Sequence, residues 1–69
     1  MFTLSAAVRI YVAAAPCDLR RGFVGLSALT RSVIGADPMS GHLFVFLNKR
    51  RDRMKILAWD RTGFLVVYN

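Results

Sequence analysis

Basic side chains gather in one short stretch of this chain. Five of its ten Lys and Arg residues lie between positions 49 and 55, namely Lys49, Arg50, Arg51, Arg53 and Lys55. Only Asp52 is acidic there. Arginine and lysine on a loop neutralise phosphate groups, and arginine can donate two parallel hydrogen bonds to one phosphate. The cluster therefore predicts recognition of a polyanion. The alternative is a solvated hairpin turn whose charges oppose aggregation of sheet edges.

A second basic motif, Arg20-Arg21, follows Asp18 at the start of a predicted helix. Two arginines there oppose the helix dipole, which favours anions at that end. A bound phosphate or an acidic partner would offset this cost. Alternatively, one arginine forms a structural salt bridge with Asp18 or Asp37, and the sequence leaves both interpretations open. The candidate nucleic-acid-binding residues are Arg20, Arg21, Lys49, Arg50, Arg51, Arg53 and Arg61.

The carboxylates argue against catalysis. The chain has four aspartates, Asp18, Asp37, Asp52 and Asp60, and no glutamate. A metal-dependent nuclease needs clustered carboxylates to hold magnesium, whereas each aspartate here falls at a predicted turn or cap, where aspartate is locally favoured. A metal nuclease is thus the weakest alternative, and we expect a non-catalytic protein with no metal and no cofactor.

Cys17 and His42 are each the sole residue of their kind. One cysteine forms neither an internal disulfide nor a cysteine-rich zinc site, and a reducing cytoplasm fits it best. We expect both side chains to have packing or loop roles.

The apolar segment 4–15 lacks a preceding basic region and is interrupted by Arg9, which makes it a poor signal peptide. It is also far below the ~20 residues of a membrane span.

The patterns along the chain predict one helix and four strands. Residues 8–14 alternate as a half-buried strand does, 43–47 are apolar at every position, and 54–59 and 64–68 complete the set. Residues 20–34 show helical spacing, with Asp18 as the N-cap and Gly35 and Pro38 as stop signals. Trp59 and Phe64 flank the last turn, where packing across strands is favoured over stacking on bases.

These elements predict an α+β fold of order β-α-β-β-β, with a mostly antiparallel sheet and one covering helix. We expect residues 1–69 to form a single small domain. The other sheet face has no helix to cover it, and the chain is 55% hydrophobic. A chain this short buries only about 60% of its unfolded surface, so we expect a homo-oligomer.

The overall charge supports a polyanionic partner. The formal net charge is +6 and the sequence pI is about 10.8, a balance that favours nucleic acid. We therefore predict contact with DNA or RNA. The competing hypothesis is a module that binds only proteins.

The ordered motifs resemble one bacterial family. They are Arg9-Ile10-Tyr11, Pro16, Asp18-Leu19-Arg20-Arg21-Gly22-Phe23, Gly25-Leu26, Asp37-Pro38, Ser40-Gly41-His42-Leu43-Phe44-Val45-Phe46, Asn48-Lys49-Arg50, Asp52-Arg53, Lys55-Ile56-Leu57, Trp59-Asp60 and Gly63-Phe64. They are similar to those of the small accessory proteins, called TnpB or Orf-two, of insertion-sequence family sixty-six.

This resemblance implies a non-catalytic role in transposition, beside the separate transposase of the same element that carries the cutting chemistry. It supplies no catalytic residues. Family members usually continue past the position of Tyr68 with a basic stretch, whereas here only Asn69 follows. The resemblance therefore implies that the family's C-terminal extension is missing.

Overall fold

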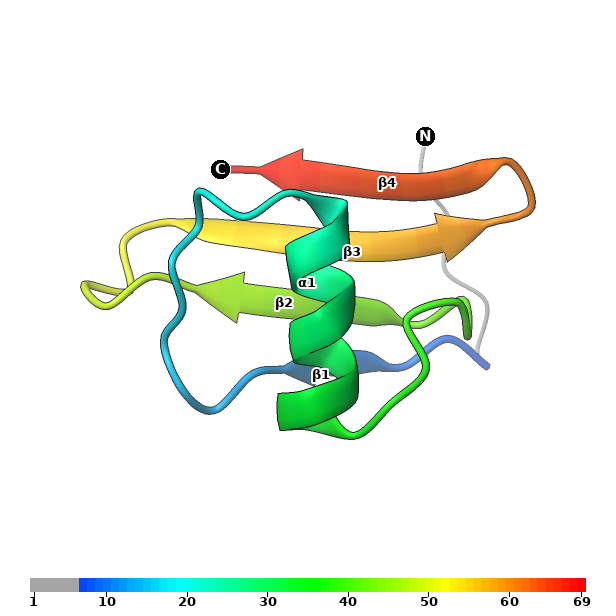
Figure 1. Ribbon diagram of the computed structural model, residues 1–69, viewed down its shortest axis with the longest axis horizontal. Helices are drawn as coiled ribbons and strands as arrows, with labels where there is room; N and C mark the ends of the chain where they lie inside the picture. The colour runs from blue at the N-terminus through cyan, green and yellow to red at the C-terminus, as the bar shows by residue number, and fades with distance from the viewer. Residues whose placement is uncertain (1–6) are drawn as a thin grey trace.

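One helical segment lies across a four-stranded sheet in the computed structural model, which describes residues 7–69 (Figure 1). The elements in chain order are β1 (Ile10–Val12), α1 (Phe23–Leu29), η1 (Thr30–Ile34), β2 (Leu43–Leu47), β3 (Met54–Asp60) and β4 (Gly63–Tyr68). The predicted α+β fold and the order β-α-β-β-β are confirmed.

The strands lie side by side in sequence order. β1 is parallel to β2, and β2, β3 and β4 form the predicted antiparallel meander. β1 is shorter than the predicted strand 8–14, although the Ala13 N–H still donates to the Val45 carbonyl over 2.9 Å. Pro16, which has no N–H, lies three residues further on.

The helix begins later than predicted. α1 starts at Phe23 rather than at residue 20, and its N-cap is the extended Gly22, with no side-chain hydrogen bond at the cap. Asp18 is therefore not the N-cap, because its carboxylate accepts hydrogen bonds from the backbone and side chain of Arg20 instead. Neither helical segment is long and apolar enough to cross a membrane.

The helix ends where the sequence predicted. Gly35 terminates it with φ of 76°, a left-handed conformation that glycine adopts without steric cost. The last turn is wider than an α-helical one, because η1 is a π-helix. The Thr30 carbonyl accepts from both Gly35 N–H and Ala36 N–H, at 2.9 and 3.2 Å.

The core lies between α1 and one face of the sheet. Its largest fully buried side chains are Phe44, Phe46, Leu26 and Leu57. Thr30 is also fully buried, and its hydroxyl donates to the Leu26 carbonyl over 2.8 Å. The opposite face of the sheet has no helix over it among residues 7–69 (Figure 1).

Candidate nucleic-acid interface

The basic cluster lies in the loop that joins β2 to β3. Two backbone hydrogen bonds close this loop: Asn48 N–H donates to the Arg53 carbonyl over 3.2 Å, and Arg51 N–H donates to the Asn48 carbonyl over 3.0 Å. Arg51 has a positive φ of 61°, which is uncommon for a residue with a side chain. Lys49, Arg50, Arg51 and Arg53 are all exposed, so the loop presents four cations to solvent. We call these four residues the basic tip.

Asn48 organises the loop from inside. Its side-chain oxygen accepts from the N–H groups of Asp52 and Arg53, at 3.1 and 3.2 Å. Its side-chain nitrogen donates to the Asp52 carboxylate over 2.7 Å. The acid of the loop is thus held by an amide. Within residues 7–69, no ion pair joins Asp52 to a residue of the basic tip.

Sequence reasoning gave Asn48 no role of its own. The available signal was an asparagine at the end of a strand with an aspartate four residues later, since both side chains bond readily to nearby backbone. Asn48 therefore has a structural role in this loop, although it carries no charge.

Arg20 is engaged by its neighbour Asp18. Arg20 Nε donates to both carboxylate oxygens at 3.0 Å, and Nη2 lies 2.7 Å from Oδ2. The hydrogen bonds from the Arg20 side chain and then its backbone N–H lower the pKa of Asp18 to about 2. The side-chain hydrogen bond to Asp18 in turn raises the pKa of the Arg20 guanidinium. The salt-bridge interpretation thus holds for Arg20, although both side chains remain in contact with solvent.

Two hydrogen bonds join the loop that carries Arg20 and Arg21 to the hairpin. Cys17 N–H donates to the Leu47 carbonyl over 2.9 Å, and the Lys55 ammonium donates to the Arg21 carbonyl over 2.9 Å. The Lys55 ammonium also lies 5.2 Å from the centre of the Tyr68 ring. Lys55 therefore has a structural task, unlike the exposed residues of the basic tip.

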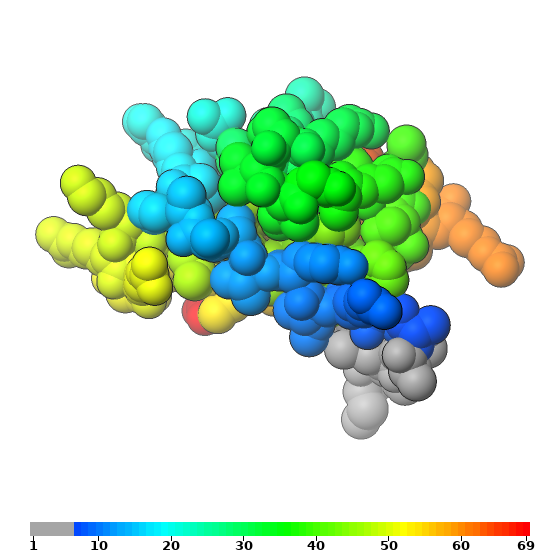
Figure 2. Space-filling view, turned by 90° about the horizontal axis from the view of Figure 1, so that it is seen from below, coloured from blue at the N-terminus to red at the C-terminus, as the bar shows by residue number. Residues whose placement is uncertain are grey.

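The structure brings six of the seven predicted residues to one end of the molecule. Residues 17–22 and the β2–β3 loop project at the same end in two perpendicular views (Figures 1 and 2). The β3–β4 turn, which carries Arg61, projects at the opposite end (Figures 1 and 2). We call the six residues at one end the cationic end: Arg20, Arg21, Lys49, Arg50, Arg51 and Arg53. Arg61 lies apart from them.

The aspartates serve separate turns. Asp37 accepts from Met39 N–H over 2.9 Å, and Asp60 accepts from the N–H and hydroxyl of Thr62 over 2.7 and 2.6 Å. These Thr62 contacts, the hydroxyl first, lower the pKa of Asp60. Within residues 7–69, no three His, Cys, Asp or Glu side chains form a group that could hold a metal ion.

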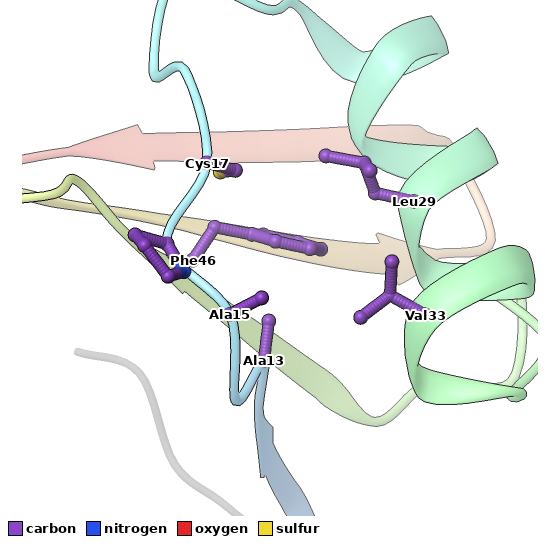
Figure 3. A pocket seen from close by; sticks show the side chains of 7 residues that line it. Ala13, Ala15, Cys17, Leu29, Val33 and Phe46 are labelled. Atoms are coloured by element: carbon purple, nitrogen blue, oxygen red, sulfur yellow. The ribbon is translucent and has the colours of Figure 1, made fainter.

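Cys17 and His42 both have packing roles. Cys17 is partly buried beside a small apolar cavity of about 40 Å³, which Leu29, Val33 and Phe46 also line (Figure 3). Burial, the largest influence, raises the pKa of its thiol. His42 Nδ1 accepts from Arg9 N–H over 3.0 Å, and its ring meets Tyr11 edge-on at 5.7 Å.

Trp59 and Phe64 pack across strands, as predicted. Their rings meet edge-on with centroids 4.8 Å apart, and they are direct partners in the β3–β4 register. Phe23, the first residue of α1, stacks on Phe64 at 5.5 Å. These aromatic contacts fix the start of the helix against the sheet.

The fold and the charge distribution define a small α+β protein in which six of the ten basic residues lie at one end. The chain belongs to the family of IS66 Orf2 like proteins, whose family model matches residues 8–69. This confirms the resemblance seen in the sequence motifs. It associates the chain with insertion-sequence transposition, in the group of accessory proteins.

Two curated relatives come from Sinorhizobium fredii. The uncharacterised protein y4jC is 47% identical over 62 residues, which cover 90% of this chain and 53% of the relative. The uncharacterised protein y4hO is 32% identical over 56 residues, covering 81% of this chain and 49% of the relative. The chain therefore spans about half the length of the curated relatives it matches. No solved structure matches it significantly.

Proposed function

We propose that this protein assists the transposition of a bacterial insertion sequence without catalysing it, by holding DNA or RNA at its cationic end. The observation that carries the proposal is the basic tip, four exposed cations on one loop. Asp52, the acid of that loop, is bonded to the Asn48 amide. The charge of the tip is therefore available to phosphates, which attract lysine and arginine irrespective of base sequence.

The geometry of the cationic end supports the same proposal. The loop of Arg20 and Arg21 is bonded to the hairpin through Lys55 and Cys17, so two basic segments face a partner together. Arg20 and Asp18 neutralise one another in part. The basic tip is therefore expected to supply most of the attraction, and the loop beside it to extend the contact along the backbone of the nucleic acid.

The test is the salt dependence of binding to a short DNA duplex. If the basic tip neutralises four phosphates, the logarithm of the binding constant falls against the logarithm of salt concentration with a slope of about −3.6. A triple variant, Lys49→Ala with Arg50→Ala and Arg53→Ala, is expected to flatten the slope by about 2.7. Because these side chains lie on an exposed loop, the fold should persist in circular dichroism.

A matched control removes the same charge elsewhere. Arg9→Ala, Arg31→Ala and Arg61→Ala together also take three positive charges from exposed positions, just before β1, in η1 and in the β3–β4 turn. This control is expected to keep most of the wild-type slope. If the salt slope flattened equally in both triple variants, the result would contradict a localised site, because net charge alone would then explain the binding.

The second candidate function is a protein-interaction module that assembles the transposition complex. The observation in its favour is the aliphatic face of the sheet, over which no helix lies within residues 7–69 and on which Ile10, Val12, Leu65 and Val67 are exposed. This alternative predicts no DNA binding at low salt by either the wild type or the triple variants. Capture of the transposase of the same element, with and without the terminal DNA of that element, separates the two functions: the module captures transposase without DNA, whereas the nucleic-acid role makes capture depend on DNA.

A further inference from the structure

The outer edge of β4 carries unpaired backbone groups. β4 pairs with β3 on one side, and within residues 7–69 no strand pairs with its other side. The N–H of Asn69, just after β4, donates to the Met54 carbonyl over 3.0 Å. Residues along an antiparallel pair bond alternately to the partner strand, so Phe64, Val66 and Tyr68 direct their N–H and C=O groups away from β3. We call these three the edge residues.

β4 lacks the features that usually protect an edge strand from pairing. Such strands commonly carry a charged side chain or a proline, or contain a β-bulge. The six residues of β4 include no charged residue and no proline. Their register against β3 is continuous, so the strand contains no bulge. By these criteria the outer edge of β4 is suited to pair with another strand.

The side chains of β4 are exposed on both faces of the sheet. On the face away from α1, Leu65 and Val67 are 48% and 46% exposed, and on the α1 face Tyr68 is 56% exposed. A layer packed on one face would cover only one of these groups. A strand beside β4 brings its own side chains alongside both faces. The exposure pattern therefore indicates a neighbouring strand.

The spacing of the edge residues fits a second copy of β4. Two copies can run antiparallel with Val66 opposite its counterpart, which places Phe64 opposite Tyr68 of the second copy. Each such pair exchanges two hydrogen bonds, so every edge residue of both copies is satisfied. The contact is two-fold symmetric and closes as a dimer, whereas β4 on the three-residue β1 of another copy would not close.

Charge favours the antiparallel arrangement. β4 begins after the turn that carries Arg61 and ends beside Met54, which follows the basic tip (Figure 1). Two copies paired antiparallel through β4 therefore place their cationic ends at opposite ends of the joined sheet. Parallel pairing would place these ends side by side, where like charges repel. Each copy carries a formal net charge of +6, so the arrangement that separates the cationic ends is favoured.

We propose that two copies of this chain pair antiparallel through β4, in the register centred on Val66, and join their sheets into one. Residues opposite one another in such a pair point to the same face, so both α1 helices lie on one side of the joined sheet. On the other side, Leu65 lies opposite Val67 of the second copy. This inference goes beyond nucleic-acid binding and does not depend on it.

Charge pairs across the proposed contact test its register, by sedimentation over a range of protein concentration at low salt. In Leu65→Lys with Val67→Glu, each introduced ammonium lies opposite an introduced carboxylate, and we expect the dimer to persist. In Leu65→Lys with Val67→Lys, like charges lie opposite, and the dissociation constant should be higher by about tenfold or more. Both positions are about half exposed, so the monomers should fold.

The matched control, Leu65→Glu with Val67→Glu, separates direct repulsion from net charge. It makes each copy less positive by two charges, so a dimer limited only by net charge would become tighter. Carboxylates placed opposite one another weaken the pairing instead. We expect this variant to dissociate as the double lysine variant does. Circular dichroism checks that all three variants fold.

Amide hydrogen exchange locates the contact on the backbone. The N–H groups of the edge residues should exchange slowly at concentrations where sedimentation gives a dimer, and rapidly in dilute protein. The N–H groups of Leu65 and Val67, which face β3 in the register, should be protected at both concentrations. The alternation between neighbouring residues is a signature that stacking on a sheet face would not produce.

Three results would overturn the proposal. The first is a folded wild type that stays monomeric at every concentration. The second is equal dissociation of all three double variants, because the register would then have no influence. The third is a dimer in which the N–H groups of the edge residues exchange as rapidly as in the monomer, which would place the contact on another surface.

Discussion

The side-chain amide of Asn48 donates to the Asp52 carboxylate over 2.7 Å, across the loop that carries the basic tip. The same asparagine accepts two backbone N–H groups, from Asp52 and Arg53. One uncharged residue therefore sets the loop conformation and holds the acid of the loop. This arrangement leaves the four cations of the basic tip without an ion pair within residues 7–69.

Replacing Asn48 tests this relationship. Asn48→Ala removes all three side-chain hydrogen bonds, and we expect the free energy of unfolding to fall by about 1 kcal/mol, since the loop is solvated. Asp52 would then be available to pair with an arginine, and affinity for a DNA duplex at low salt should fall although no cation is lost. Chemical denaturation and a binding titration measure the two effects. Unchanged affinity would show that Asp52 does not compete with DNA for the arginines of the basic tip.

Arg51 allows charge and backbone strain to be separated. Its φ of 61° is a left-handed conformation, which costs an L-residue roughly 1–2 kcal/mol and glycine almost nothing. Arg51→Gly should therefore raise the free energy of unfolding by up to about 1 kcal/mol, while the salt slope of DNA binding flattens by about 0.9.

The matched variant is Arg50→Gly, which removes the same charge from a residue whose φ is not positive. It should flatten the slope equally without stabilising the fold. A stability gain of the same size in both variants would show that the gain comes from removing charge and not from relieving the backbone.

The Asp18–Arg20 pair makes a prediction about pH. Hydrogen bonds from Arg20 lower the pKa of Asp18 to about 2, from an ordinary value of 3.8. Because the pKa in the folded state lies below the unfolded value, the pair stabilises the fold fully above the unfolded pKa. That contribution is lost as pH falls from about 3.8 toward 2. The effect on stability should be small, since the pair is exposed.

Carboxyl chemical shifts measured by NMR across this acidic range test the assignment directly. In Arg20→Gln the midpoint of Asp18 should rise toward its ordinary value, because the charged guanidinium and its forked hydrogen bonds are gone. In Arg21→Gln it should stay close to the wild type, since Arg21 is the smallest of the influences on Asp18. A midpoint that does not move in Arg20→Gln would refute the pairing in solution.

Local sequence signals predicted the strands of the meander well. Residues 43–47, 54–59 and 64–68 match β2, β3 and β4 to within a residue, because apolar and β-branched runs alternate with strong turn residues such as Gly63. The end of the helix at Gly35 followed in the same way. The strand bounds and the helix end depend on residues that are adjacent in the chain, so they can be predicted from the sequence alone.

The start of the helix was missed because two local structures compete for Asp18. Its carboxylate suits an N-cap, but it also suits a turn closed by Arg20, and the structure contains the turn. Phe23 then stacks on Phe64, a contact between residues far apart in the chain that helps to fix where the helix begins. The sequence alone carried no signal for this contact.

The sequence by itself determined the order of the helix and strands, the basic tip, and a sheet with a helix on only one face among residues 7–69. The separation of Arg61 from the tip also follows from the meander, because β3 runs its full length between the two turns. Only the tertiary structure decided that Arg20 and Arg21 lie beside the basic tip. It also decided that the Lys55 ammonium donates a hydrogen bond to the Arg21 carbonyl. Both depend on hydrogen bonds between residues thirty or more positions apart, namely those from Cys17 to Leu47 and from Lys55 to Arg21. Such bonds form only when the parallel pairing of β1 with β2 returns the chain to the same end of the sheet.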